Sequence, residues 1–114
     1  MKLYQILLSK EVIAKVNAGA SMAEVPEWKA HLDAQCLGQF PGSQFYMHVA
    51  DIDTTDPEHA FEIGNIGPEE KITRYAPMHS VSVGDVLVTD YGTAFIVKSI
   101  GFESVADWDP SLTH

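Results

Sequence analysis

The chain has 114 residues, of which 46% are hydrophobic and 20% charged, a balance that suits a single domain over residues 1–114 with a core that needs no metal or disulfide. Seven Lys or Arg against sixteen Asp or Glu give a formal net charge of −9, which disfavours direct binding to the phosphate backbone of a nucleic acid. The apolar run near the N-terminus is too short for a signal peptide or a membrane span, so we expect a cytoplasmic protein without a membrane partner.

The first predicted unit is a strand followed by a short helix. Leu3–Leu8 is a mainly apolar run that is typical of a strand. Ser9 is a suitable N-cap, and the helix that it starts is expected over residues 10–18, with Gly19 ending it. The side chains predicted to face inward are Val12, Ile13 and Val16.

A second helix is predicted between Pro26, which suits a first helical turn, and Gly38, which suits a C-cap. Trp28, Leu32 and Cys36 recur at four-residue spacing and predict its buried face. Cys36 is the one cysteine of the chain, so no intrachain disulfide can form and a reducing compartment is expected. Its apolar, helical setting predicts a buried thiol that is not reactive.

The middle of the chain predicts a strand and a third helix. The turn-rich residues 39–44 precede an apolar strand at residues 45–50. Asp56 is the predicted N-cap of the helix, Pro57 lies in its first turn, and the helix is expected to close near residues 65–67. The predicted buried side chains of this helix are Ala60, Phe61 and Ile63.

The last third of the chain predicts mainly strands. One is expected at residues 71–76, and the apolar runs at residues 86–88 and 95–97 flank the turn Asp90-Tyr91-Gly92-Thr93, which predicts a β-hairpin. Residues 105–114 lack periodicity and predict an irregular tail. The expected fold class is α+β, a small single domain with N-terminal helices packed on a mainly antiparallel sheet that ends in the C-terminal hairpin.

One resemblance to a known family lies between Arg74 and Phe102. It is carried by Arg74-Tyr75, by the segment HSVSVGDV at residues 79–86 and by SIGF at residues 99–102. Together these segments resemble the core of YodL-like domains. The resemblance implies a small domain of undetermined biochemical activity, of the kind that recurs in proteins of phages and conjugative elements, some of them linked to defeating host defences. It implies a biological setting and no mechanism.

Residues 51–70 form a strongly acidic segment without Lys or Arg. One interpretation is a solvated face that keeps a small protein soluble. A second is a surface complementary to a basic partner, which in one form would imitate a phosphate backbone. Cation binding is the third. The carboxylates of the partner-binding hypothesis are Asp51, Asp53, Asp56, Glu58, Glu62, Glu69 and Glu70.

The same part of the chain raises the alternative of a metal site. Four residues suit zinc or non-haem iron, because the end of a strand and the start of a helix can converge. They are His48, Asp51, Asp53 and His59. A calcium loop starting at Asp51 would need Gly where Asp56 stands, which argues against an EF-hand. The structural interpretation is a packed or hydrogen-bonded His48 and an exposed His59, and we assign no metal ligand and no cofactor.

The loop before the hairpin contains a further motif, whose residues are His79, Ser80, Ser82, Gly84 and Asp85. Adjacent residues of an extended segment point to opposite faces, so His79 cannot readily serve Ser80 as a base, and no catalytic residue is assigned. Gly84-Asp85 is a turn signal, and the serine side chains can bond nearby backbone groups. The motif is therefore predicted to be structural, with the loop held by side-chain to backbone hydrogen bonds and fixed by His79.

These observations favour a non-enzymatic accessory protein of a phage or mobile element. Such a protein would occlude a basic surface of a host protein, for example one that binds nucleic acid or serves in defence, through the acidic segment. The competing hypotheses are a metal-binding protein or metal-dependent enzyme built on the four residues above, and a domain that assembles into a homo-oligomer.

Overall fold

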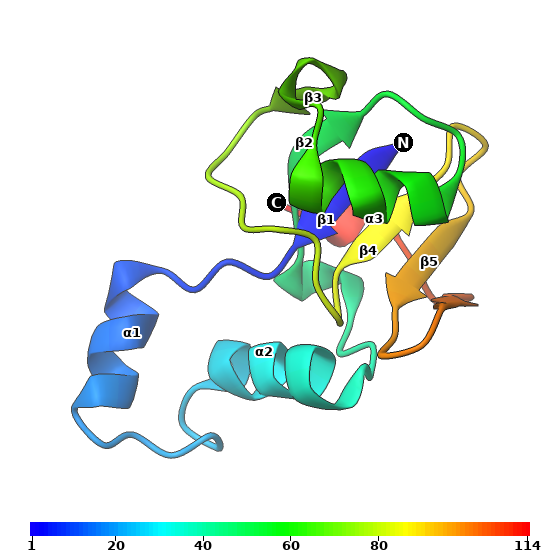
Figure 1. Ribbon diagram of the computed structural model, residues 1–114. Coiled ribbons are helices and arrows are strands. Elements are labelled where there is room, and N and C mark those ends of the chain that lie inside the picture. The colour runs from blue at the N-terminus through cyan, green and yellow to red at the C-terminus, as the bar shows by residue number, and fades with distance from the viewer.

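The computed structural model describes residues 1–114 and contains three α-helices and a six-stranded sheet (Figure 1). The helices are α1 (Lys10–Asn17), α2 (Pro26–Leu37) and α3 (Pro57–Ile66). The strands are β1 (Lys2–Gln5), β2 (Met47–Ile52), β3 (Ile72–Arg74), β4 (Val86–Val88), β5 (Ala94–Val97) and β6 (Phe102–Ser104). Short 3₁₀ turns cover Ser43–Phe45, Glu69–Lys71 and Pro110–Leu112. None of the helices has the length and apolar character needed to cross a membrane.

The sheet has the order β3-β2-β1-β4-β5-β6, and each neighbouring pair is antiparallel. β1 lies inside the sheet, where Leu3 is opposite Ala50 of β2 on one side and Leu87 of β4 on the other. The predicted hairpin is confirmed as β4 and β5, with Leu87 opposite Phe95. The strand predicted at residues 71–76 is present in a shorter form as β3. This antiparallel sheet with its three helices confirms the α+β class.

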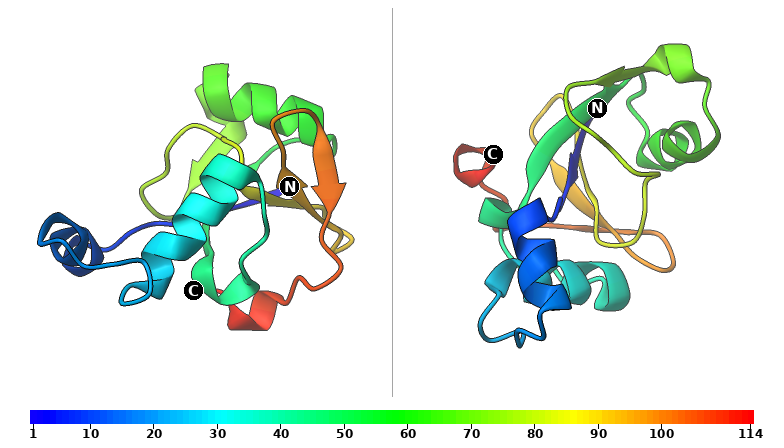
Figure 2. Two further views of the ribbon diagram at one scale, coloured as in Figure 1. Left: turned by 90° about the horizontal axis from the view of Figure 1, so that it is seen from below. Right: turned by 90° about the vertical axis from the view of Figure 1, so that its left-hand side faces the viewer.

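Each face of the sheet carries its own apolar core, because successive strand residues point to opposite sides. In β4, Leu87 belongs to the core that also holds Ala60 and Ile63 of α3. Its neighbours Val86 and Val88 belong to the core on the other face. Figure 2 shows the consequence, with α3 and the C-terminal turn on opposite sides of the sheet.

β1 ends three residues earlier than predicted, because its two antiparallel partner strands do not extend past the positions opposite Gln5 and Tyr4. Gln5 is opposite Met47, the first residue of β2, and Tyr4 is opposite Val86, the first residue of β4. Beyond Gln5 the chain has no strand to pair with. Residues 6–9 therefore leave the sheet and lead to α1 (Figure 1).

Helix α1 stands beside α2 and away from the sheet (Figure 1). Its predicted N-cap is confirmed, since the Ser9 hydroxyl accepts a hydrogen bond from the backbone N–H of Val12 at 3.2 Å. Its predicted inward face is wrong. No residue of α1 is buried: Val12 and Val16 are half-buried and Ile13 is 45% exposed. The cause is the extended connection before the helix, which carries α1 beyond the edge of the core.

Helix α2 has the predicted bounds but a different buried face. Gly38 adopts the left-handed conformation of a C-cap, with φ 63°, and donates its N–H to Ala34. The buried residues are Ala30 and Ala34, not the stripe predicted from the larger side chains. Cys36 of that stripe is exposed, so the prediction of a buried thiol is wrong. The reason is that α2 meets the body of the protein through its small residues, which allow a close approach of the backbones.

Helix α3 follows its prediction closely. Asp56 is the N-cap and accepts a hydrogen bond from a backbone N–H of the first turn at 3.1 Å. Ala60 and Ile63 are buried as predicted, whereas Phe61 is 38% exposed. Ala60 and Ile63 lie three residues apart on the face that meets the sheet, and Phe61 lies beside that face, where the sheet covers it only in part.

The C-terminal segment adds a strand that the sequence analysis missed, β6, which pairs with β5 at one edge of the sheet. Residues 105–114 contain only a 3₁₀ turn, in line with the predicted irregular tail. The tail nevertheless packs on the body: the ring centroids of Trp108 and Tyr4 are 4.7 Å apart, and Asp109 N–H donates to the Ser43 hydroxyl at 2.8 Å. It thereby covers the aromatic core on the face opposite α3.

Candidate functional site

Six of the seven carboxylates of the acidic segment fall into two groups instead of one cluster, and Glu69 stands apart in an ion pair with Arg74. The first group lies at one end of the sheet, around a shallow hollow that we call the sheet-end hollow. Its charged lining groups are the carboxylates of Asp51, Asp53, Glu70 and Asp90, with the ammonium groups of Lys2, Lys71 and the Met1 terminus. The second group lies on α3 and consists of its N-cap Asp56 with Glu58 and Glu62. The acidic segment thus presents two negative regions, one around the sheet-end hollow and one on α3.

Two of the seven carboxylates are already engaged within the protein. Asp51 accepts hydrogen bonds from the Tyr75 hydroxyl at 2.6 Å and from His48 Nε2 at 2.8 Å. Partial burial works in the other direction, but these two bonds and the charge of His48 hold the pKa of Asp51 below its usual value. Glu69 forms a two-point ion pair with Arg74, at 2.6 and 3.2 Å, which lowers the pKa of the Glu69 carboxyl.

Four other carboxylates are exposed and make no hydrogen bond or ion pair through their side chains. They are Asp53 and Glu70 at the sheet-end hollow and Glu58 and Glu62 on α3. Asp56 is also exposed, but one of its oxygens serves the helix cap. The unpartnered carboxylates are the part of the acidic segment that is free to meet a cation from outside.

Of the four residues of the metal hypothesis, the structure brings only His48 and Asp51 into contact. His48 bonds Asp51 and its ring stacks on Tyr4, with centroids 5.1 Å apart, as expected for a packed, hydrogen-bonded histidine. His59 is exposed, and its Nδ1 lies 3.3 Å from the Thr54 hydroxyl. No group of three or more His, Cys, Asp or Glu side chains is placed to share one ion. The convergence of the strand end and the helix start that the metal alternative requires is therefore not present in this structure.

The loop before β4 is held by the type of bonds predicted for it. The carboxylate of Asp85 accepts from the N–H of Ser82 at 2.9 Å, and the Ser82 hydroxyl donates to the carbonyl of Ser80 at 2.8 Å. Gly84 has φ +91°, and its carbonyl accepts from the Tyr46 hydroxyl at 2.6 Å. The loop is thus closed by its own side chains and fastened to the body through Gly84.

The sequence analysis missed the side chain that anchors this loop, which is the fully buried Gln5 of β1. Its Oε1 accepts from His79 N–H at 3.2 Å, and its Nε2 donates to the His79 carbonyl at 2.8 Å and to Asp85 at 3.0 Å. The side chain thereby uses both amide hydrogens and its oxygen. The signal in the sequence is a single amide residue inside the otherwise apolar run Leu3–Leu8.

The ring of His79 takes a defined tautomer in this arrangement. Its Nδ1 lies 2.8 Å from the carbonyl of Ser80, which can only accept, so Nδ1 carries the proton. The 3.2 Å approach of Gln5 Nε2 to the same nitrogen is then a contact between two donors, not a hydrogen bond. His79 therefore fixes the loop locally through its Nδ1 proton.

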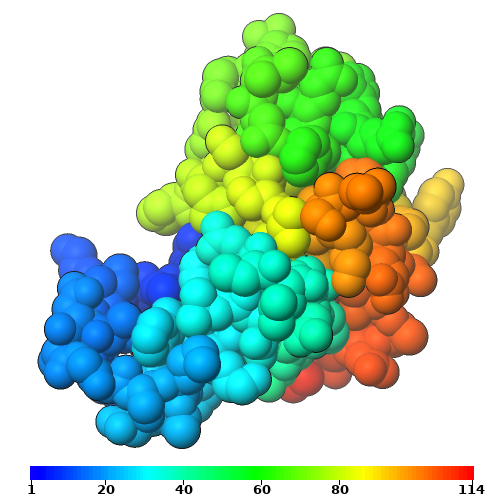
Figure 3. Space-filling view, turned by 60° about the horizontal axis from the view of Figure 1, so that its bottom comes forward, coloured from blue at the N-terminus to red at the C-terminus, as the bar shows by residue number.

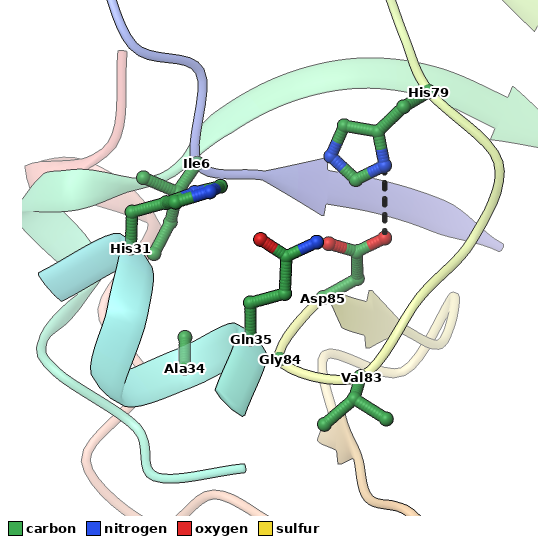
Figure 4. Close-up of a pocket in the computed structure, with 8 residues that line it drawn as sticks. All are labelled: Ile6, His31, Ala34, Gln35, His79, Val83, Gly84 and Asp85. Carbon is green, nitrogen blue, oxygen red and sulfur yellow. Dashed lines mark ion pairs between the residues drawn. The ribbon is translucent and has the colours of Figure 1, made fainter. Parts of the chain in front are cut away.

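A narrow pocket separates this loop from α2 (Figure 4). His31 and Gln35 of α2 face His79 and Asp85 across it, and the His79 ring and the Asp85 carboxylate are 4.0 Å apart. The pocket volume is only ≈ 10 Å³, which is about the space of one water molecule. It is therefore a packing gap lined by polar groups and does not admit a substrate.

Two titratable groups around this pocket have shifted pKa values. Burial raises the pKa of Asp85 to about 6, although the bonds from Ser82 and Gln5 and the proximity of His79 act in the opposite direction. Burial lowers the pKa of His31, and His79 adds to that effect. Both shifts have the sign expected when a charged form is removed from water.

Comparison with family models, with curated proteins and with solved structures finds no match for this chain. The resemblance to YodL-like domains accordingly stays a prediction from the sequence.

Proposed function

We propose that the protein binds and occludes a basic surface of another protein through the two negative regions of its acidic segment. The observation that carries this proposal is the set of four exposed carboxylates that have no ionic or hydrogen-bond partner, Asp53, Glu58, Glu62 and Glu70. They belong to a chain with a formal net charge of −9. Opposite charges on a partner would speed association and fix its orientation.

The proposed mechanism is steric and electrostatic. Lys or Arg side chains of the partner meet the free carboxylates, and the bound protein covers the surface that the partner uses. The contact set is narrower than the seven carboxylates predicted from the sequence, since Asp51 and Glu69 already have partners and Asp56 serves the cap of α3. In this role the protein would act without catalysis, cofactor or nucleic-acid contact of its own.

The resemblance to YodL-like domains supports a setting for this role. It implies an accessory protein of a phage or mobile element that acts in the cytoplasm of a host cell. The target would then be a host protein with a basic surface, such as one that binds nucleic acid or takes part in defence.

The proposal is tested by affinity capture from a host lysate at low and high salt. The wild-type protein is compared with a variant that carries Asp53→Lys, Glu58→Lys and Glu62→Lys. A matched control carries Glu11→Lys, Glu24→Lys and Glu27→Lys. It changes the net charge by the same amount, but in the part of the chain that forms α1 and α2. A protein captured at low salt by the wild type and by the control, and lost in the first variant, is the expected result.

Two outcomes would contradict the proposal. Equal loss in both variants would mean that only the overall charge matters, and retention in both would mean that the acidic segment is not the contact. Sedimentation velocity of the wild type at the same salt concentrations tests self-assembly, the competing use of this surface.

A further inference from the structure

A groove runs between α3 and the turn that joins β5 to β6, next to the α3 carboxylates. It is lined by Phe61 of α3 and by Val97 and Phe102 of the two strands, and it has a volume of ≈ 220 Å³. Small-molecule pockets usually measure about 300–1,000 Å³, so this groove has the size of a side chain. Figure 3 shows α3 directly above the β5–β6 turn on this side of the molecule.

Large apolar side chains around this groove remain in contact with water. Phe61 is 38% exposed, although it lies on a helix with a buried face. Ile100 is 92% exposed and lies between Ser99 and Gly101, which both line the groove. Phe61 and Ile100 thus leave apolar side-chain surface exposed beside the groove, which a partner's apolar side chain could cover.

The charge at the rim of the groove selects what can enter it. Glu58 lines the groove and Glu62 follows one helical turn later, and both are exposed without a partner. The one cation at the rim, Lys98, is already engaged, because its ammonium donates to the Gly38 carbonyl at 2.8 Å and lies 3.5 Å from Glu103. The free charge beside the apolar groove is therefore negative.

We infer that this groove is the anchor site for the basic partner, and that its occupant is a partner segment with one large apolar side chain next to Lys or Arg. The apolar side chain enters between Phe61 and Phe102, and the adjacent cation meets Glu58 and Glu62. A desolvated apolar anchor within a charged rim is the usual arrangement of a binding hot spot. This inference rests on the proposed function and deepens it by assigning the chemistry of the contact.

Two synthetic peptides of equal length and charge test the inference, one alternating Lys with Leu and the other alternating Lys with Ser. Each is titrated into the ¹⁵N-labelled protein, and amide shifts give both the affinity and the location of binding. We expect the Lys–Leu peptide to bind at least about tenfold more tightly and to shift the amides of Phe61, Val97 and Phe102. Phe61→Ala should reduce the affinity of the Lys–Leu peptide to that of the Lys–Ser peptide. The double variant Glu58→Gln with Glu62→Gln should weaken binding of the Lys–Leu peptide and make that binding less dependent on salt.

The outcomes separate this inference from the proposed function. Equal affinity of the two peptides, with shifts only at residues such as Asp53 and Glu70, would overturn the groove as the anchor and leave electrostatic occlusion standing. Unchanged Lys–Leu affinity in the Phe61→Ala variant would overturn it as well. Failure of both peptides to bind at low salt would count against the groove and against the proposed function together.

Discussion

The side-chain amide of Gln5 pairs with the backbone of His79, 74 residues further along the chain, through one accepted and one donated hydrogen bond of 3.2 and 2.8 Å. The side chain thus acts as a backbone partner for a loop that lies outside the sheet. It also donates to Asp85, so that one buried residue of β1 satisfies three polar groups of the loop before β4.

Gln5→Ala should therefore destabilise the protein by about 2–4 kcal/mol, because it leaves the N–H and carbonyl of His79 and the carboxylate of Asp85 short of a partner. The free energy of unfolding is measured by urea denaturation. Gln39→Ala, at an exposed position, is the control and should cost less than about 0.5 kcal/mol. Equal effects of the two substitutions would show that the pairing adds nothing to stability.

The buried carboxyl of Asp85 should make stability depend on pH. Burial raises its pKa from the ordinary value of 3.8 to about 6, so between these values the folded state binds more protons than the unfolded state. Stability should therefore fall as the pH rises from about 4 to about 6, by an amount on the order of 3 kcal/mol from this group. The measurement is the free energy of unfolding of the wild type and of Asp85→Asn across this range.

The difference between the two curves gives the contribution of Asp85 alone to the pH dependence of stability. The contributions of His79, of His31 across the pocket and of the carboxyls with lowered pKa values are common to both proteins and cancel. We expect the wild type to lose stability relative to Asp85→Asn as the pH rises. Parallel curves would contradict the assigned pKa.

Gly84 is required for its conformation and for the space it leaves. It has φ +91°, and a Cβ at this position would contact the backbone of Ala34 and lie only 2.8 Å from its Cβ. Gly84→Ala should therefore push α2 off the loop and cost more than about 3 kcal/mol, as for other overpacked or strained sites. Gly92→Ala is the matched control, since Gly92 has φ +86° with open space around it, and should cost about 1–2 kcal/mol. Thermal denaturation gives both values, and similar costs would rule out the close approach of α2.

The hydroxyl of Tyr75 should control the acidity of Asp51. Tyr75→Phe removes a 2.6 Å hydrogen bond that lowers the pKa of Asp51, so this pKa should rise in the variant. Carboxyl ¹³C chemical shifts followed through a pH titration report it directly. Tyr91→Phe, at a residue that is 97% exposed, is the control and should leave the pKa of Asp51 unchanged. An unchanged value in both variants would mean that the Tyr75 bond does not persist in solution.

Local signals in the sequence were sufficient for much of the fold. The caps Ser9, Asp56 and Gly38 were predicted correctly, because each depends on a few neighbouring residues. The β4–β5 hairpin was predicted from its turn and its two apolar runs. The acidic segment was also visible, since charge can be read without a structure.

Features that depend on distant parts of the chain could not be predicted in the same way. The buried face of α2 is set by the close approach of Ala34 to Gly84, which lies 50 residues later in the chain. This approach favours the small residues of α2 at the contact over the stripe of larger side chains that includes Cys36. The role of Gln5 depends on a loop that pairs with it only in the folded chain. Which carboxylates are free depends on where Tyr75 and Arg74 fall in the fold.

The central claim is tested most directly by the affinity of the captured partner, measured at low and high salt, for the wild type and for the variant with Asp53→Lys, Glu58→Lys and Glu62→Lys. We predict an affinity for the wild type that falls steeply with salt, and a loss of at least about a hundredfold in the variant, since each like-charge contact would oppose binding. The control with Glu11→Lys, Glu24→Lys and Glu27→Lys should bind as the wild type does. An affinity that is insensitive to salt, or equal in the wild type and the acidic-segment variant, would contradict the account.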